Sequence, residues 1–198
     1  MSHTPLPPTE LDELLASEFD YIAQTATQAN EDRARVSSFY LIAVGSLVAA
    51  LFGTQFFDAA SFNFNVKIMF SGLFLLLTML GISTIMQLAR LRAAWYESMM
   101  AMNQMKDFAI AQRPELAGAF RWKTSTLPSK YKTASVSYYQ AVEVALIGGL
   151  VFAAAIFFLQ LAFLRDTADT SIVHWIVAVT AGIAMVFVQL QIYRRSLK

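Results

Sequence analysis

Long uncharged stretches alternate with charged ones along this chain. The uncharged stretches are residues 36–57, 66–88, 142–164 and 172–192. The only acidic or basic side chains inside them, Lys67 and Glu143, lie next to an end. Because a helix of ~20 apolar residues crosses the ~30 Å hydrocarbon core of a bilayer, the pattern predicts four transmembrane helices.

The composition agrees with this prediction. Of the 198 residues, 57% are hydrophobic and 15% are charged, whereas soluble domains average ~45–50% and ~25%. Four uncharged helices of this length would leave too little polar surface for a water-soluble fold. We therefore expect an all-α integral membrane protein.

Basic side chains gather on one side of the predicted spans. Arg33 and Arg35 precede the first span, and three of the six residues in the tail 193–198 are basic. Eight Lys or Arg residues lie between the second and third spans. Since basic residues favour the cytoplasmic side, we expect a multi-pass protein of the plasma (inner) membrane with both termini in the cytoplasm.

The first two spans are expected to continue as helices outside the membrane. Residues 1–8 hold three prolines and predict an irregular start, whereas residues 9–35 contain no Pro or Gly and enter span one unbroken. Residues 89–113 likewise follow span two without a helix breaker before Pro114. Spans one and two should therefore extend into a cytoplasmic antiparallel helical stalk.

The link of residues 114–139 is basic, aromatic and interrupted by Gly118 and Pro128. Aromatic and basic side chains suit the headgroup zone of a membrane. The candidates for contact with the lipid surface are Arg121, Trp122, Lys123, Lys130 and Lys132. An ordinary cytoplasmic loop with interfacial aromatic residues explains the same pattern and is the interpretation we favour.

Three polar residues within the predicted spans are candidates for function. Glu143 could handle a proton or an ion, although its position near the start of span three favours a boundary role. His174 is more simply an interfacial anchor beside Trp175 than a metal or pigment ligand, since the spans contain no second histidine. Gln160 could form a hydrogen bond between helices or line a polar path.

Small residues recur at four-residue steps in three of the spans, and such ladders allow membrane helices to approach closely. The candidates for helix packing are Gly45, Ala49, Gly53, Ala145, Gly149, Ala153, Ala178 and Gly182. Their partners could lie within the chain, which we favour, or in a second copy.

The sequence supplies little for catalysis. It has no cysteine, no metalloprotease, hydrolase or phosphate-loop motif, and no pair of acids within the spans. We expect no enzyme activity, no metal, no cofactor and, with a net charge of +1, no nucleic-acid partner.

The segment "EFDYIAQTATQANEDRARVSSFYL" and the membrane hairpin after it resemble small bacterial membrane proteins and the layout of SLATT-type domains, in which a cytoplasmic helix precedes a transmembrane hairpin. The resemblance covers residues 9–112. It implies a pore-forming membrane effector of a defence system, and it transfers no functional residue. Spans three and four depart from that layout.

Three functions follow as hypotheses. The first is a non-catalytic structural or partner-docking subunit of a membrane complex, with the stalk as the docking element. The second is a homo-oligomeric pore or membrane effector. The third is a proton-coupled carrier that uses Glu143. The expected partners are the lipid bilayer and either further copies of the chain or other membrane subunits.

Overall fold

The structure is a computed structural model that describes residues 8–53, 63–164 and 168–198. Its helices are α1 (Pro8–Gly53), α2 (Phe64–Gln112), α3 (Val136–Phe163) and α4 (Ala168–Ser196), with the short 3-10 turns η2 (Pro114–Gly118) and η3 (Thr124–Thr126) between α2 and α3. The described residues form no strand. The predicted all-α class is confirmed.

All four long helices contain a window long and apolar enough to cross a membrane. This confirms the number of predicted spans and makes the chain a multi-pass membrane protein. Residues 54–57, the predicted end of span one, lie outside the described part. Helix α3 starts at Val136, within the predicted link, because the Ser135 side chain caps it by accepting a hydrogen bond from the Tyr138 N–H.

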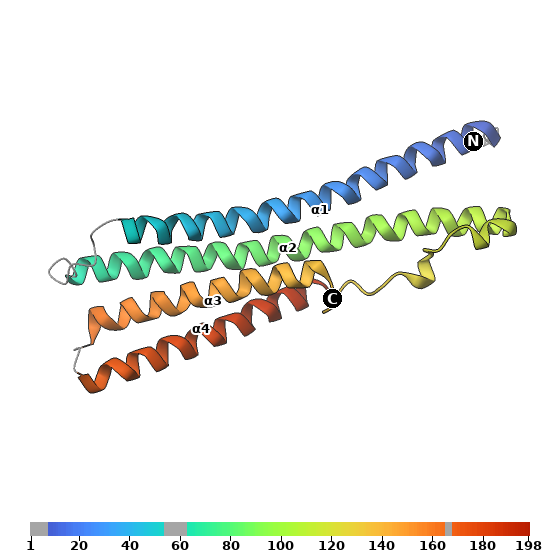
Figure 1. Ribbon diagram of the computed structural model, residues 1–198. Coiled ribbons are helices and arrows are strands. Elements are labelled where there is room, and N and C mark those ends of the chain that lie inside the picture. Colours follow the sequence, from blue (N-terminus) through green and yellow to red (C-terminus); the bar gives the residue numbers. More distant parts are fainter. Residues whose placement is uncertain (1–7, 54–62, 165–167) are drawn as a thin grey trace, which may run out of the picture.

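Helix α2 is the centre of the molecule (Figure 1). It packs against α1 along most of its length and against α3 and α4 along one half. At ~1.5 Å per residue, α2 is about 30 Å longer than α3. The α1–α2 extension, defined here as residues 8–32 and 93–112, therefore projects beyond the four-helix half.

The apolar core lies in the four-helix half. There, the Phe158 ring packs on Phe70 and Phe74, with ring centroids 5.3 and 5.7 Å apart. The most deeply buried apolar side chains come from all four helices and are Tyr40, Ile85, Leu88, Ala89, Ala141, Val144, Ala145, Ala155, Ala178 and Tyr193. The four-helix half is thus one packed unit.

The α1 helix turns one face toward α2 along its length. Ala26, Ala29, Tyr40 and Val44 are buried there, at the three- and four-residue steps of one helical stripe. Near the N-terminus, α1 diverges from α2 (Figure 1) and leaves a groove of about 420 Å³ between them. The two helices of the extension are thus packed less closely toward their ends.

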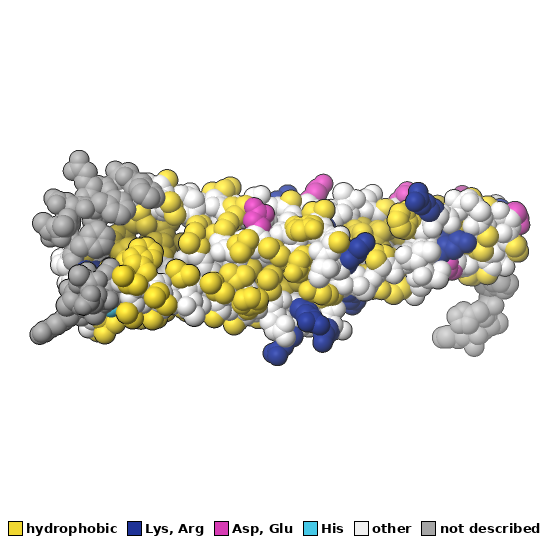
Figure 2. Space-filling view, turned by 60° about the horizontal axis from the view of Figure 1, so that its bottom comes forward, with side chains coloured by type: hydrophobic (Ala, Val, Ile, Leu, Met, Phe, Trp, Pro, Cys, Tyr) yellow, Lys and Arg dark blue, Asp and Glu magenta, His cyan; other side chains and the backbone are white. Residues whose placement is uncertain are grey.

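The surface also divides into two parts. On the face shown in Figure 2, hydrophobic side chains are dense over the four-helix half, whereas Lys, Arg and most acidic side chains lie over the middle and the extension. This division is what a chain with one half in lipid requires.

Candidate functional site

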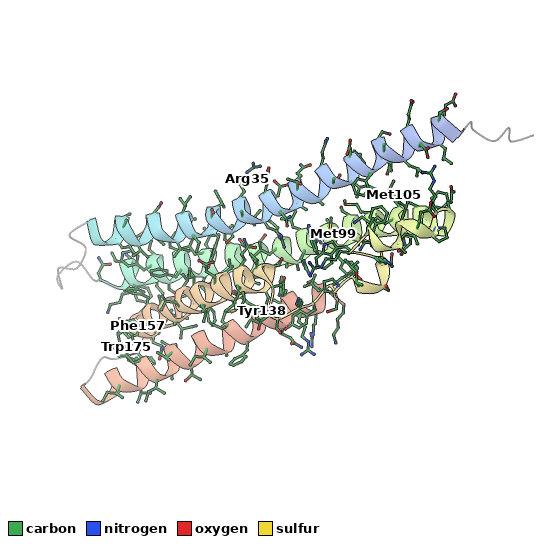
Figure 3. The ribbon with its side chains drawn as sticks, turned by 45° about the vertical axis from the view of Figure 1, so that its right-hand side comes forward. Arg35, Met99, Met105, Tyr138, Phe157 and Trp175 are labelled. Carbon is green, nitrogen blue, oxygen red and sulfur yellow. The ribbon has the colours of Figure 1, made fainter. Side chains whose placement is uncertain are left out.

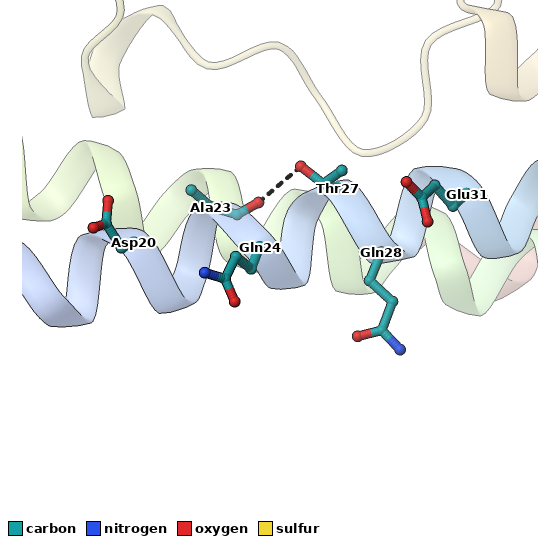
Figure 4. A pocket seen from close by; sticks show the side chains of 6 residues that line it. All are labelled: Asp20, Ala23, Gln24, Thr27, Gln28 and Glu31. Atoms are coloured by element: carbon teal, nitrogen blue, oxygen red, sulfur yellow. Dashed lines mark hydrogen bonds between the residues drawn. The ribbon is translucent and has the colours of Figure 1, made fainter.

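The α1 part of the extension is acidic. Residues 8–32 contain seven acidic side chains and no basic one. Asp20, Ala23, Gln24, Thr27, Gln28 and Glu31 line an open groove on this part of α1 (Figure 4). Among the described residues, the one ion pair made by this segment joins Asp32 to Arg35 of the same helix, at 3.3 Å. The acidic face is not neutralised by α2 or by the link.

The link between α2 and α3 runs back along the extension instead of leaving it. The Asn103 side chain donates a hydrogen bond to the Lys123 carbonyl at 3.2 Å, and the Thr124 N–H donates one to Asp107 at 3.3 Å. Nearer to the four-helix half, Arg92 Nε donates to the Lys130 carbonyl at 3.2 Å. These contacts attach the middle of the link to α2 at two levels.

A cavity of about 260 Å³ lies between the link and α2. Trp95, Met99 (labelled in Figure 3) and Lys106 line it from α2, and Trp122 and Leu127 line it from the link. Its walls are mostly apolar and it is smaller than most ligand pockets.

The lipid-surface candidates divide into two groups. Lys123 lies beside Asn103, 15 residues beyond the predicted end of span two, which is about 22 Å at ~1.5 Å per residue. Arg121 and Trp122 are its neighbours in the chain and are both exposed. Lys130 and Lys132 lie closer to the spans, where the Lys130 carbonyl meets Arg92. The link follows the axis of α2, so only the second group is near the predicted lipid surface.

The small residues of spans three and four meet each other. A Cβ atom on Gly149 would lie 2.7 Å from the Gly182 carbonyl oxygen, and one on Gly182 would lie 2.7 Å from that of Gly149 and 2.9 Å from the Ala153 Cβ. Ala145 and Ala178 are buried in the same half. The ladders of α3 and α4 are therefore used within the chain.

The ladder of span one has a different position. Gly45 has no neighbouring atom within 4 Å of an added Cβ, and Ala49 is exposed. The surroundings of Gly53, the last residue of α1, lie outside the described residues. Gly45 and Ala49 thus face the outside of the bundle.

The three polar candidates of the spans lie apart from one another. Glu143 is exposed on the surface of α3. The Gln160 side chain donates hydrogen bonds to the carbonyls of Ile156 and His174, both at 3.3 Å, and so joins α3 to α4. His174 is buried, whereas Trp175 is exposed and packs on Phe157 at 4.4 Å between ring centroids (Figure 3).

The most unusual polar cluster lies where the four-helix half meets the extension. We call it the arginine junction; it consists of Arg33 of α1, Arg92 of α2, Ser137 of α3 and Tyr193 of α4. Arg33 and Arg92 are only 8% and 5% exposed, and Ser137 and Tyr193 are also buried. Arg33 donates hydrogen bonds to Ser137 and to Asn30. One polar side chain from each helix therefore meets at this level.

Electrostatics at the arginine junction are unbalanced. The guanidinium groups of Arg33 and Arg92 are close enough to repel each other, and both interact with the Tyr193 hydroxyl group. Among the described residues, neither arginine forms an ion pair, and Arg33 Nε is buried without an acceptor. Burying two like charges is costly unless something compensates them.

The charge pattern of the sequence does not predict this junction, because Arg33 and Arg92 enter it only as basic residues that orient the chain. A signal was present. Arg33 follows Ala26 and Ala29 and precedes Tyr40 on one helical stripe, so it belongs to the face that packs against α2. No comparable pattern in the sequence shows that Ser137 and Tyr193 reach the same level.

Within the described ranges, no group of three or more His, Cys, Asp or Glu side chains is placed to hold a metal ion. Comparison of the chain with protein-family models, with curated proteins and with solved structures gives no match.

Proposed function

We propose that this chain is a non-catalytic subunit of a membrane complex, and that the α1–α2 extension is a cytoplasmic stalk that docks a partner. The partner's docking surface is basic. The stalk supplies reach and charge, and the four-helix half anchors it in the bilayer.

The acidic face of α1 carries this proposal. The segment of residues 8–32 contains seven acidic side chains and no basic one, and two of them, Asp20 and Glu31, line the outer groove. Among the described residues, none of the seven forms an ion pair with another helix or with the link. Apolar side chains are exposed on the same segment, with Tyr21 66% and Leu14 54% exposed. Charge of one sign steers and orients a complementary partner, while exposed aromatic side chains add contact area.

The test compares two charge-neutralised variants of the full chain. In D20N/E31Q both changes line the groove of α1, whereas the control E97Q/E115Q removes the same charge from α2 and η2. A partner purified with the tagged chain in detergent should be lost from D20N/E31Q, kept by E97Q/E115Q and released by added salt. Equal retention by the two variants would contradict the proposed docking face.

The cytoplasmic orientation has its own test. Because the chain has no cysteine, single cysteines introduced by Glu13→Cys and Ser61→Cys can be labelled without background. In intact cells a membrane-impermeant thiol reagent should label position 61 only, and after lysis it should label both. Labelling of position 13 in intact cells would reverse the orientation.

A homo-oligomeric pore or effector is the second candidate, and one observation favours it. Ser83 and Gln87 are exposed on α2 within a predicted span, and their side chains are 3.4 Å apart. Polar side chains facing lipid gain from contact with another helix. Purified protein in liposomes should then release a trapped dye, and a Gln87→Leu variant should release less; intact liposomes would remove this candidate.

The carrier proposal depends on Glu143 alone. If it is correct, Glu143→Gln abolishes proton-coupled uptake in vesicles that carry the wild-type chain. Since Glu143 is exposed on α3 and not enclosed by the bundle, this is the least supported of the three functions.

A further inference from the structure

We propose that the arginine junction binds a phosphate group, held between Arg33 and Arg92 and supplied either by an anionic phospholipid headgroup or by free phosphate. This binding site is separate from the acidic docking face, and it does not depend on the function proposed above.

The arginine junction carries positive charge that the described residues do not balance. Each arginine is more than nine-tenths buried, but its hydrogen-bond acceptors are neutral: the hydroxyl group of Ser137, the side-chain oxygen of Asn30 and the carbonyl of Lys130. Neutral acceptors satisfy N–H groups and leave the two positive charges uncompensated. An anion would compensate both.

The acids closest in sequence to Arg33 and Arg92 have other partners. Glu97 pairs with Lys130 at 3.6 Å, on the exposed side of α2, and Asp32 pairs with Arg35. Neither carboxylate reaches Arg33 or Arg92. The compensating anion therefore has to come from outside the described part of the chain.

The hydrogen-bond donors at the junction also suit a phosphate group. A guanidinium group presents a planar fork of N–H donors that matches two oxygens of a phosphate group, and the hydroxyl groups of Ser137 and Tyr193 add donors from α3 and α4. Ser137 also lies in the first turn of α3, where unpaired N–H groups and the helix dipole favour an anion. A phosphate oxygen would replace Ser137 and Asn30 as the acceptor for Arg33.

The junction also lies at the depth in the membrane where lipid phosphates are expected. Arg33 lies three residues before predicted span one, Arg92 four residues after predicted span two, and Tyr193 directly after predicted span four. All three therefore lie at the end of the hydrocarbon zone, where lipid phosphates are found. Arg194, the residue after Tyr193, lies over the Tyr131 ring at 5.8 Å and adds positive charge near the same level.

Tryptophan fluorescence provides the measurement. The Arg92 guanidinium group lies 4.4 Å from the centroid of the Trp95 ring, so an anion at the junction should change Trp95 emission. The other two tryptophans, Trp122 and Trp175, are more than half exposed and can be replaced. The W122F/W175F chain, purified in dodecyl maltoside without phosphate, thus reports on Trp95 alone.

Three titrants separate the possible sources. Dioleoylphosphatidylglycerol supplies a lipid phosphate, dioleoylglycerol has the same acyl chains without one, and inorganic phosphate is compared with sodium chloride at equal ionic strength. We expect the phospholipid to change Trp95 emission in a saturable way, and dioleoylglycerol to leave it unchanged. A response to inorganic phosphate as well assigns the site to free anions. No response to either phosphate overturns the proposal.

Charge variants complete the test. In R33Q and R92Q the apparent Kd for the phospholipid should rise at least tenfold. The control is R35Q, because the Arg35 side chain is 78% exposed and points away from the bundle in Figure 3. R35Q should keep the wild-type Kd. In wild type, the phospholipid at roughly ten times Kd should also raise Tm by about 4 °C. Equal responses in R33Q, R92Q and R35Q would overturn the proposal. If R33Q or R92Q does not fold, the titration of the chain with both arginines decides whether the junction binds phosphate.

Discussion

The four-helix half and the α1–α2 extension share two continuous helices but are held together differently. In the four-helix half, α3 and α4 approach until the backbones at Gly149 and Gly182 touch, and most buried side chains are apolar. In the extension, two of the buried side chains of α2 are Ser98 and Asn103, and the link is attached to α2 through hydrogen bonds. Close backbone packing suits helices surrounded by lipid, where hydrophobic burial gives no drive for association.

The largest expected effect comes from breaking the closest backbone contact. Gly149→Leu places a side chain where a Cβ alone would be 2.7 Å from the Gly182 carbonyl oxygen, so α3 and α4 must separate. We expect a loss of about 3 kcal/mol in the free energy of unfolding, measured by denaturation in detergent.

The control for this change is Gly45→Leu, at a glycine with no neighbour within 4 Å. It should change stability by less than about 0.5 kcal/mol. A large loss at Gly45 with none at Gly149 would contradict the packing described here.

A smaller effect is expected where α1 meets α2 within the spans. A Cβ on Gly81 would lie 2.7 Å from the Tyr40 hydroxyl oxygen, which is buried and has no hydrogen-bond partner among the described residues. Gly81→Ala should cost about 2 kcal/mol. Tyr40→Phe, which removes the hydroxyl group, should recover about 1 kcal/mol of that loss in the double variant. Additive effects would mean that the two residues do not touch.

Within the extension, loosening the link should have a local effect. Asn103→Ala removes the hydrogen bond to the Lys123 carbonyl, at a cost of about 1 kcal/mol. Trypsin should then cut after Arg121 and Lys123 several times faster, while the unfolding of the four-helix half stays the same. A change in that unfolding, without faster cleavage, would show that the two regions are not separate.

The smallest effect is expected on the outer face of α1. Leu14 is 54% exposed, so Leu14→Ser should change the stability of the isolated chain by less than about 0.5 kcal/mol. Thermal unfolding in detergent is the measurement. A larger loss would mean that this face is already covered, by a second copy of the chain.

The parts of this architecture that follow from local pattern could be predicted. Four uncharged runs and the absence of breakers before Pro114 led to the four apolar helices and to the continuity of α2. The path of the link could not be predicted, because it depends on single hydrogen bonds from Asn103 and Arg92 that leave no periodic signal. For the same reason the arginine junction was missed: its members lie far apart in the sequence, and only the packing of α3 against α2 and α1 brings Ser137 to Arg33.

Helix α1 contains no Pro or Gly between Pro8 and Gly45. A helix without these residues lacks the usual sites for a sharp kink. A displacement of α1 near Asp20 is therefore expected to reach Arg33 and Tyr40, which are buried on the face that packs against the other helices.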